Sequence, residues 1–333
     1  MGFMASLALL FLGLGYSYVE GMTNLSKEED LELEEQVNML NKPPIKTVKD
    51  EVGDIFDCVD IEKQPAFDHL LLKNHKLQTK PSFNPVLLTN NGVASTSTHS
   101  RTLPKRVGCP QGTVPIRRTR KEDLIRAKTF SESYFATISP LTTEKPGQHV
   151  SPQLFGDNNT RLFSYYKGKD NKGCFNILCF GFVQVDKDHP IGQVLPHGDQ
   201  VEMPLAIAQD VRSRNWWLLN VDKAIQYGYW PYLLFSHMEE GGSQGAWGGV
   251  AIGDAGQPSP PMGSGTFPND VAHASYIKRL AVTDADYRFG SPDRDTIQRY
   301  ADVPKCYGVT DYGVRKEGGY TFMYGGPGGQ CGD

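Results

Sequence analysis

The stretch Cys174-Phe175-Asn176-Ile177-Leu178-Cys179, followed by Phe180-Gly181-Phe182-Val183-Gln184, decides the fold of the second half of this 333-residue chain. Two cysteines five residues apart, in a chain that begins with an apolar leader, predict a short disulfide loop rather than a cytosolic redox motif. The apolar and aromatic residues around them predict two strands joined across a turn. The sequence therefore indicates an oxidising compartment and a second half made of β-strands.

An apolar run over residues 4–14 lies near the N-terminus. It is shorter than the roughly 20 residues that a membrane span needs, and the small residues Ser17 and Gly21 follow it. This pattern predicts a signal peptide over residues 1–21, with a buried N-terminal helix as the alternative. No later segment is apolar enough to cross a membrane. We therefore expect the mature protein outside the cytosol, secreted or in a vacuole, and not in a membrane.

The composition is nearly balanced in charge and rich in turn-forming residues. The chain has 34 basic and 38 acidic side chains, which argues against nucleic acid as a main partner. Its 35 glycines are typical of short strands joined by many turns, and its six cysteines allow up to three disulfides. Asn24 and Asn158 each begin an Asn-X-Ser/Thr triplet and are candidate glycosylation sites, although such triplets also arise by chance. We expect a monomer.

The first third of the chain differs from the rest. Ser26 with Glu29 predicts a capping box that opens a short helix in a charged segment. Residues 81–104 are rich in Ser, Thr, Asn and Pro and predict an exposed linker. The basic run 117–121 is a candidate processing site, with a solvated charged face as an equal alternative.

Three regions follow from this organisation. After a helical stretch at Asp123–Lys128, the sequence predicts one strand after another from about residue 147. We therefore expect a signal peptide, a small mixed or irregular propeptide with its linker over residues 22–128, and an all-β domain over residues 129–333.

Common catalytic patterns are nearly absent. The eight histidines lack the His-Glu-x-x-His spacing of a zinc site and no phosphate-binding glycine loop occurs, so we expect no metal and no cofactor. Ser243 lies in a Gly-x-Ser-x-Gly pattern, with Asp254 and His273 downstream in the order of a hydrolase triad. Such a serine needs a strand before it and a helix after it, whereas residues 246–250 are glycine-rich and strand-like. The sequence favours a hairpin turn over a serine hydrolase.

Clusters of aromatic residues and glycine are far more distinctive. In order, they are Asn215-Trp216-Trp217-Leu218, Tyr227-Gly228-Tyr229-Trp230-Pro231, Trp247-Gly248-Gly249, residues 262–268 and residues 324–328. Large aromatics alternating with glycine suit strands that pack across a sandwich beside a shallow groove. Exposed aromatics in such a groove can hold a peptide or a sugar, and our candidates are Tyr227, Tyr229, Trp230 and Trp247. Core packing is the alternative for most of them.

Together with the motifs that begin at Cys58 and at Cys109, Cys-Val-Asp-Ile-Glu-Lys-Gln-Pro-Ala-Phe-Asp-His and Cys-Pro-Gln-Gly-Thr-Val-Pro-Ile-Arg-Arg-Thr, these clusters resemble the plant neprosin family. The resemblance covers about residues 45–128 and 147–331. It implies a secreted glutamic peptidase that cleaves after proline and is made with an N-terminal activation peptide. It also implies an antiparallel β-sandwich with a substrate groove on one sheet. The implied disulfides are Cys174–Cys179, Cys306–Cys331 and, within the propeptide, Cys58–Cys109.

The sequence departs from the family pattern at both catalytic glutamates. In such an enzyme one glutamate acts as general base on a water molecule and the other, kept protonated, as general acid. Lys145 occupies one family position, and Glu144 precedes it by one residue, which in a strand turns its side chain to the opposite face. Val250 occupies the other position, after Trp-Gly-Gly. Glu144 is therefore a weak catalytic candidate, and we expect impaired or absent activity.

The alternative function is non-catalytic. An aromatic-lined groove without the catalytic carboxylates suits the binding of proline-rich wall proteins or glycans. These proline-containing peptides or wall components are the partners that we expect.

The chain is also shorter than the family pattern at one place. Only residues 127–146 connect two blocks between which the family carries several more strands. We therefore expect an incomplete sandwich, a sheet edge exposed near residues 147–154 and little order over residues 130–146. We further expect the propeptide to contact the β-domain through residues 61–77, in particular through Phe67, Leu70, Leu71 and Leu72.

Overall fold

A computed structural model describes residues 25–85, 103–137, 147–149, 151–169, 172–196, 202–236, 238–253, 256–269, 274–283, 289–315 and 319–331. Of residues 132–137, 147–149 and 289 it describes the backbone alone. Five residues singled out from the sequence lie outside the described residues, namely Asn24, Glu144, Lys145, Asp254 and His273.

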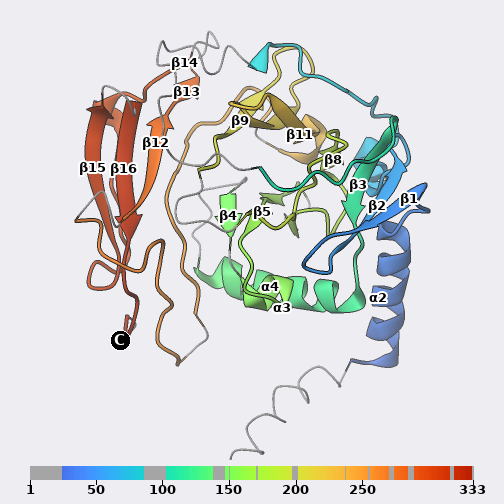
Figure 1. The fold of residues 1–333 in the computed structure, drawn as a ribbon, viewed down its shortest axis with the longest axis horizontal. Coiled ribbons are helices and arrows are strands. Elements are labelled where there is room, and N and C mark those ends of the chain that lie inside the picture. Colours follow the sequence, from blue (N-terminus) through green and yellow to red (C-terminus); the bar gives the residue numbers. More distant parts are fainter. Residues whose placement is uncertain are drawn as a thin grey trace, which may run out of the picture.

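Short antiparallel strands make up most of the described chain, which confirms the all-β class (Figure 1). The α-helices are α2 (Lys27–Leu40), α3 (Lys121–Thr137) and α4 (Pro152–Phe155). The strands are β1 (Lys46–Lys49), β2 (Ile55–Asp60), β3 (Thr113–Arg117), β4 (Gly147–His149), β5 (Arg161–Phe163), β6 (Tyr165–Lys167), β7 (Gly173–Phe175), β8 (Val183–Gln184), β9 (Leu205–Gln209), β10 (Trp216–Asn220), β11 (Ile225–Trp230), β12 (Ser275–Leu280), β13 (Val282–Thr283), β14 (Phe289–Gly290), β15 (Gly308–Arg315) and β16 (Gly319–Gly325).

The N-terminal region forms a small sheet with order β1–β2–β3, beside helix α2 (Figure 1). The capping box of α2 is confirmed: the backbone N–H of Glu29 donates to Ser26 Oγ at 3.1 Å, and that of Ser26 donates to Glu29 Oε2 at 3.1 Å. Two reciprocal bonds thus satisfy donors that the first helical turn leaves without a helical partner. This region is mixed in structure, as the sequence predicts for the propeptide.

A four-stranded sheet with order β8–β11–β10–β9 lies at the centre of the molecule. Its two middle strands pair Trp217 with Tyr229, and a bulge shifts the register between Leu218 and Leu219. Successive side chains of a strand point to opposite faces, so an apolar sheet of this kind has two surfaces to bury. One face carries Trp216, Leu218, Tyr227 and Trp230 and belongs to the largest buried cluster; the other carries Trp217, Leu219 and Tyr229.

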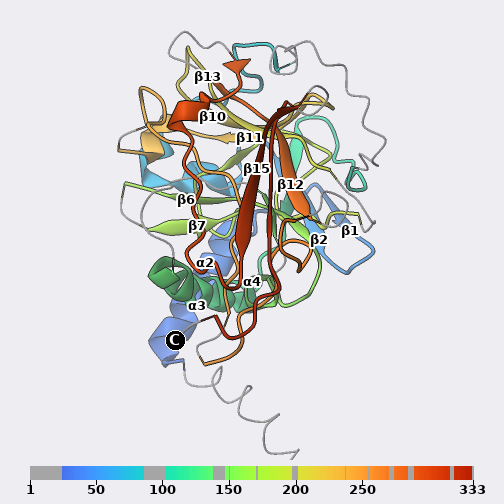
Figure 2. The same ribbon diagram turned by 90° about the vertical axis from the view of Figure 1, so that its left-hand side faces the viewer.

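A three-stranded sheet with order β12–β16–β15 forms the C-terminal part and stands in front of the rest of the molecule in Figure 2. Its buried cluster consists of Leu280, Tyr320 and Phe322, with partly buried neighbours from the same C-terminal part. The packing of two sheets face to face as a sandwich stays a prediction.

Three disulfides join Cys58 to Cys109, Cys174 to Cys179 and Cys306 to Cys331, the same pairs that the family resemblance implies. The strands on either side of the short Cys174–Cys179 loop are present, as β7 and β8. They do not pair with each other, however: β7 pairs with β6, and β8 pairs with β11. The prediction of one hairpin across this turn was wrong, because residues 176–182 lead the chain from one sheet into another.

The connection after the N-terminal region is more ordered than the sequence predicts. Helix α3 continues to Thr137, and Phe130 is buried against Phe155 and Phe175. The ring centroids of Phe130 and Phe175 lie 5.4 Å apart. Apolar packing thus fixes the first part of the segment that was expected to lack order. Leu154 belongs to α4 and not to a sheet edge.

A buried ion-pair network links the N-terminal region to the β-domain. The side chain of Arg161 is 1% exposed, and its guanidinium pairs with Asp54 and with Asp157 and donates to the carbonyl of Gly192 at 2.9 Å. Arg117 pairs with the same Asp54 at 3.0 Å. Since unpaired buried charges are costly, each partner holds the others in place.

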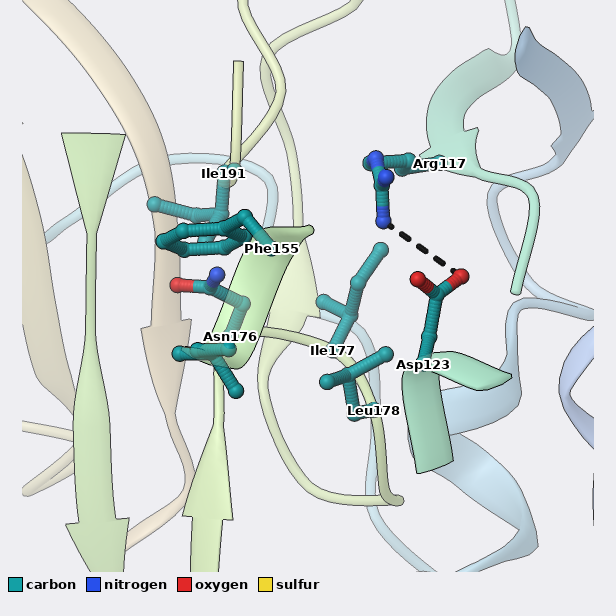
Figure 3. A pocket seen from close by; sticks show the side chains of 9 residues that line it. Arg117, Asp123, Phe155, Asn176, Ile177, Leu178 and Ile191 are labelled. Carbon is teal, nitrogen blue, oxygen red and sulfur yellow. Dashed lines mark ion pairs between the residues drawn. The ribbon is translucent and has the colours of Figure 1, made fainter. Parts of the chain in front are cut away.

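The network continues beside a small pocket (Figure 3). There Arg117 pairs with Asp123 of helix α3 at 3.6 Å, next to Phe155, Ile177 and Ile191.

We predict that Arg161→Met lowers the free energy of unfolding by about 3 kcal/mol, because it leaves the buried carboxylate of Asp54 with only one of its two arginine partners and removes the ion pair of Asp157. Urea unfolding of the full chain measures this change. The matched control is Lys105→Met, which removes an ion pair with Glu51 whose side chains are 80% and 81% exposed, and we expect no measurable change there. Equal losses in the two variants would contradict the prediction.

Candidate functional site

Residues of the N-terminal region cover the second face of the four-stranded sheet. Ala66, Phe67, Leu77 and Phe83 pack on the cluster that contains Trp217 and Tyr229, together with Val183, Ala208 and Leu219 of the sheet. The N-terminal region therefore buries the apolar side chains on this face of the sheet.

The contact predicted from the sequence is confirmed only in part. Phe67 packs on the sheet, and Leu72 is buried in the largest cluster. Leu70 and Leu71 are exposed, at 76% and 46%. They lie in a single 3-10 turn, Leu70–Leu72, which directs only the last of its three side chains inward.

Three of the four predicted binding aromatics do not line a groove. Tyr227, Tyr229 and Trp230 are fully buried, Tyr227 and Trp230 in the largest cluster and Tyr229 under the N-terminal cover. Burial raises the pKa of Tyr227 and of Tyr229 to about 12. The prediction was wrong for these three because both faces of the sheet are packed. Trp247 is 43% exposed and remains a candidate.

The segment over residues 75–85, which we call the strap, makes polar contacts to the sheet as well. The hydroxyl of Tyr229 accepts from the backbone N–H of Gln78 at 3.0 Å and lies 2.9 Å from His75 Nε2. Burial lowers the pKa of His75, so the neutral imidazole is favoured in this position. The strap begins the region predicted to be a linker, yet its Pro81 and Pro85 are buried.

The carboxylate of Asp210, just after strand β9, is the centre of these contacts. It accepts from Gln78 Nε2 at 2.9 Å, from Ser82 Oγ at 2.8 Å and from the backbone N–H of Ser82. Within its own turn it accepts from the backbone N–H groups of Arg212 at 2.9 Å and Ser213 at 3.0 Å. Burial alone would raise the pKa of Asp210, but these hydrogen bonds outweigh it and lower the pKa.

The side-chain amide of Gln78 is held at both of its ends. Its Oε1 accepts from Ser213 Oγ at 2.7 Å and from Asn215 Nδ2 at 2.8 Å, while its Nε2 donates to Asp210. An ionised carboxylate only accepts hydrogen bonds, which fixes the orientation of the amide. The four residues Asp210, Ser213, Asn215 and Tyr229 form what we call the strap site.

The family's catalytic positions are described only in part. Lys145 and Glu144 are outside the described residues, and Val250 is 47% exposed in an irregular segment. The second glycine of the Trp-Gly-Gly motif before it is explained by packing: a Cβ on Gly249 would lie 2.6 Å from Met262 Sδ and from Tyr324 Cε2. Only glycine fits this close approach to β16.

Other predicted sites have mixed outcomes. Ser243 is exposed within residues 241–250, which form neither strand nor helix, so the strand and helix that a nucleophile elbow requires do not flank it. Asn158 is exposed, as a glycan acceptor must be. In the described part of the chain, no group of three His, Cys, Asp or Glu side chains could hold a metal ion, and no helix there is long and apolar enough to cross a bilayer.

Sequence reasoning missed most of the strap site. Asn215 appeared only as the first residue of an aromatic cluster, and Gln78, Ser82, Asp210 and Ser213 were not singled out. Their bonds join residues 128 to 137 positions apart, and no local pattern predicts pairs at that separation.

The fold and the strap together define a class of protein: an antiparallel β-domain with an N-terminal region packed over one face of its central sheet. Comparison with known families agrees. The family profile described as Neprosin matches residues 128–327, and the profile described as Neprosin activation peptide matches residues 47–160. The chain belongs to the neprosin family. The strap lies within the activation-peptide match, and the two matches overlap over residues 128–160.

We predict that the strap loosens as the pH falls from 7 to 5. Because burial lowers the pKa of His75 below its ordinary value of 6.5, the docked strap binds fewer protons there than the released one. Docking is therefore at full strength above pH 6.5 and weakens below it. Asp210, with its pKa lowered from 3.8, stays ionised over this range. Hydrogen exchange at the strap, corrected for the intrinsic pH dependence of exchange, measures this.

The control for this prediction is His75→Gln, which keeps a polar side chain beside Tyr229 but does not titrate. We expect the pH dependence of strap protection to disappear in this variant. The same dependence with glutamine at position 75 would show that another group is responsible.

Proposed function

We propose that the protein is a secreted neprosin-family precursor whose β-domain has little or no glutamic peptidase activity. The observation that carries the proposal is Val250, which occupies the position after Trp-Gly-Gly and lies half exposed in the described structure. Valine can neither accept nor donate a proton, so the general acid–base pair of the family is incomplete. The three disulfides support an oxidising compartment.

Lys145, at the second catalytic position of the family, also argues against peptidase activity. A peptidase of this type needs two carboxyl groups that share a proton, because each stabilises the protonation state that the other requires. A lysine brings a positive charge in place of one carboxyl group. Loss of one general acid or base alone lowers the rate by about 10²-fold or more.

We predict that the processed protein at acid pH cleaves a proline-containing peptide at least about 10²-fold more slowly than an intact family member. Val250→Glu alone will not restore turnover, because the second carboxyl group is still missing. Restoration requires at least Lys145→Glu together with Val250→Glu, and the absent strands as well. The matched control is Val250→Gln, which has the shape of glutamate but no carboxyl group. Turnover of the unaltered protein at the level of an intact family member would refute the proposal.

A non-catalytic binding function through Trp247 is the second candidate. The other three tryptophans of the chain are buried, whereas Trp247 exposes nearly half of its surface. An exposed indole can stack on flat, stiff ligands such as proline rings or sugars. We propose proline-rich wall proteins or glycans as the ligands of this surface.

Tryptophan fluorescence tests this binding. We expect a proline-rich peptide or a wall polysaccharide at millimolar concentration to change the emission. Trp247→Ala should abolish this change, while the emission of the three buried tryptophans remains. The control is Phe267→Ala, which removes another exposed aromatic residue. If no ligand alters the emission, this candidate function is excluded.

A further inference from the structure

We propose that the strap site is a peptide-recognition site of the β-domain, specific for a segment with a glutamine followed three residues later by proline and then serine. In the precursor, the protein's own Gln78, Pro81 and Ser82 occupy it. Once the activation peptide is displaced, the site takes a segment of the same chemistry from another protein. This inference goes beyond the proposed function and holds whether or not the bound peptide is cleaved.

Glutamine is recognised through both ends of its amide. Two donors, Ser213 Oγ and Asn215 Nδ2, meet the amide oxygen, and one acceptor, the Asp210 carboxylate, meets the amide nitrogen. Glutamate would place a second carboxylate against Asp210 and remove the donor. Leucine would remove one hydrogen-bond partner from each of the three polar side chains Asp210, Ser213 and Asn215. A site built to pair with a polar side chain rejects analogues that lack its groups, because its own buried groups then stay unpaired.

The β-domain organises this site from its own residues. The backbone N–H of Asp210 donates to the carbonyl of Asn215 at 2.8 Å, and the backbone N–H of Arg214 donates to the carbonyl of Asp210 at 2.7 Å. Asn215 Oδ1 accepts from the backbone N–H of Tyr232 at 3.4 Å. The turn between β9 and β10 therefore closes on itself without the strap. A preformed site loses less conformational freedom when it binds.

The remaining contacts set the register of the peptide. The backbone N–H of Gln78 donates to Tyr229, and the backbone N–H of Ser82 donates to Asp210. Between these two hydrogen bonds Pro81 is buried, whereas Thr79 and Lys80 are exposed and do not contribute to recognition. Leu77 and Phe83 flank the polar contacts and pack on the apolar face of the sheet. The ligand class is thus a glutamine- and proline-containing peptide with apolar neighbours.

Binding of a peptide added in trans to the full chain tests the proposal. The chain carries Gln78→Glu, which weakens the docking of its own strap, and the probe is a fluorescently labelled peptide with the sequence of residues 75–85, measured by anisotropy at pH 7. We expect this peptide to bind the Gln78→Glu chain at least tenfold more tightly than the unaltered chain, whose site is filled. A probe with glutamate in place of glutamine should bind at least tenfold more weakly, and one with valine in place of threonine at position 79 should bind equally well.

A specificity switch separates recognition from general packing. Asp210→Asn places a donor opposite position 78 of the strap, so the Gln78→Glu strap should dock again, and the chain with both substitutions should bind the glutamine probe at least tenfold more weakly than the Gln78→Glu chain does. The proposal would be overturned if the glutamine and glutamate probes bound equally well to the Gln78→Glu chain. It would also be overturned if the glutamine probe did not bind although hydrogen exchange showed that the strap is released.

Hydrogen exchange provides a second test in case a variant used in the peptide experiment folds poorly. In the full chain, Gln78→Glu should raise hydrogen exchange at the backbone amides of residues 78 and 82 at least tenfold, Thr79→Val should not, and Asp210→Asn should restore protection in the Gln78→Glu chain. An equal effect of Gln78→Glu and Thr79→Val would overturn the proposal. Because neither measurement depends on cleavage, both outcomes are independent of peptidase activity.

Discussion

The structure depends on the need to cover both faces of the four-stranded sheet. Apolar side chains alternate along β10 and β11, so Trp216 and Leu218 fill one face while Trp217 and Leu219 fill the other. Burial of each large apolar side chain contributes about 1.5–3 kcal/mol relative to exposure. The first face is covered within the main core, and the second is covered by the activation peptide. The hydrophobic core of the precursor therefore includes a segment of the propeptide.

Polar contacts give this apolar cover its register. Hydrophobic packing is not directional, whereas the hydrogen bonds from Gln78 and Ser82 to Asp210 require one position of the strap along the sheet. The ion pair of Arg161 with Asp54 joins the N-terminal region to the β-domain at a second place. The Cys58–Cys109 disulfide closes the N-terminal region around the strap. The activation peptide is thus held at several separate points.

Local sequence signals predicted the parts of the fold that depend on local chemistry. The capping box at Ser26 and Glu29 is an interaction between neighbours, and it was predicted correctly. The exposure of the aromatics was not, because strict alternation would place Tyr227 and Tyr229 on the same face, whereas a bulge in the pairing with β10 puts them on opposite faces and a distant segment covers Tyr229. The second half of the strap, from residue 81, was assigned to a linker because Ser and Pro are typical of linkers. Its order comes from Asp210, more than a hundred residues away, and long-range pairing of this kind has no local signature.

A double-mutant cycle between Gln78 and Asn215 is the most direct measurement of this arrangement. Gln78→Ala, Asn215→Ala and the double variant are unfolded in urea, and the coupling between the two side chains is obtained from the four free energies of unfolding. Since Asn215 Nδ2 donates to Gln78 Oε1 at 2.8 Å in a partly buried setting, we predict a favourable coupling of about 1 kcal/mol. Additive effects, with a coupling within about 0.3 kcal/mol of zero, would mean that the strap does not dock on the sheet as described.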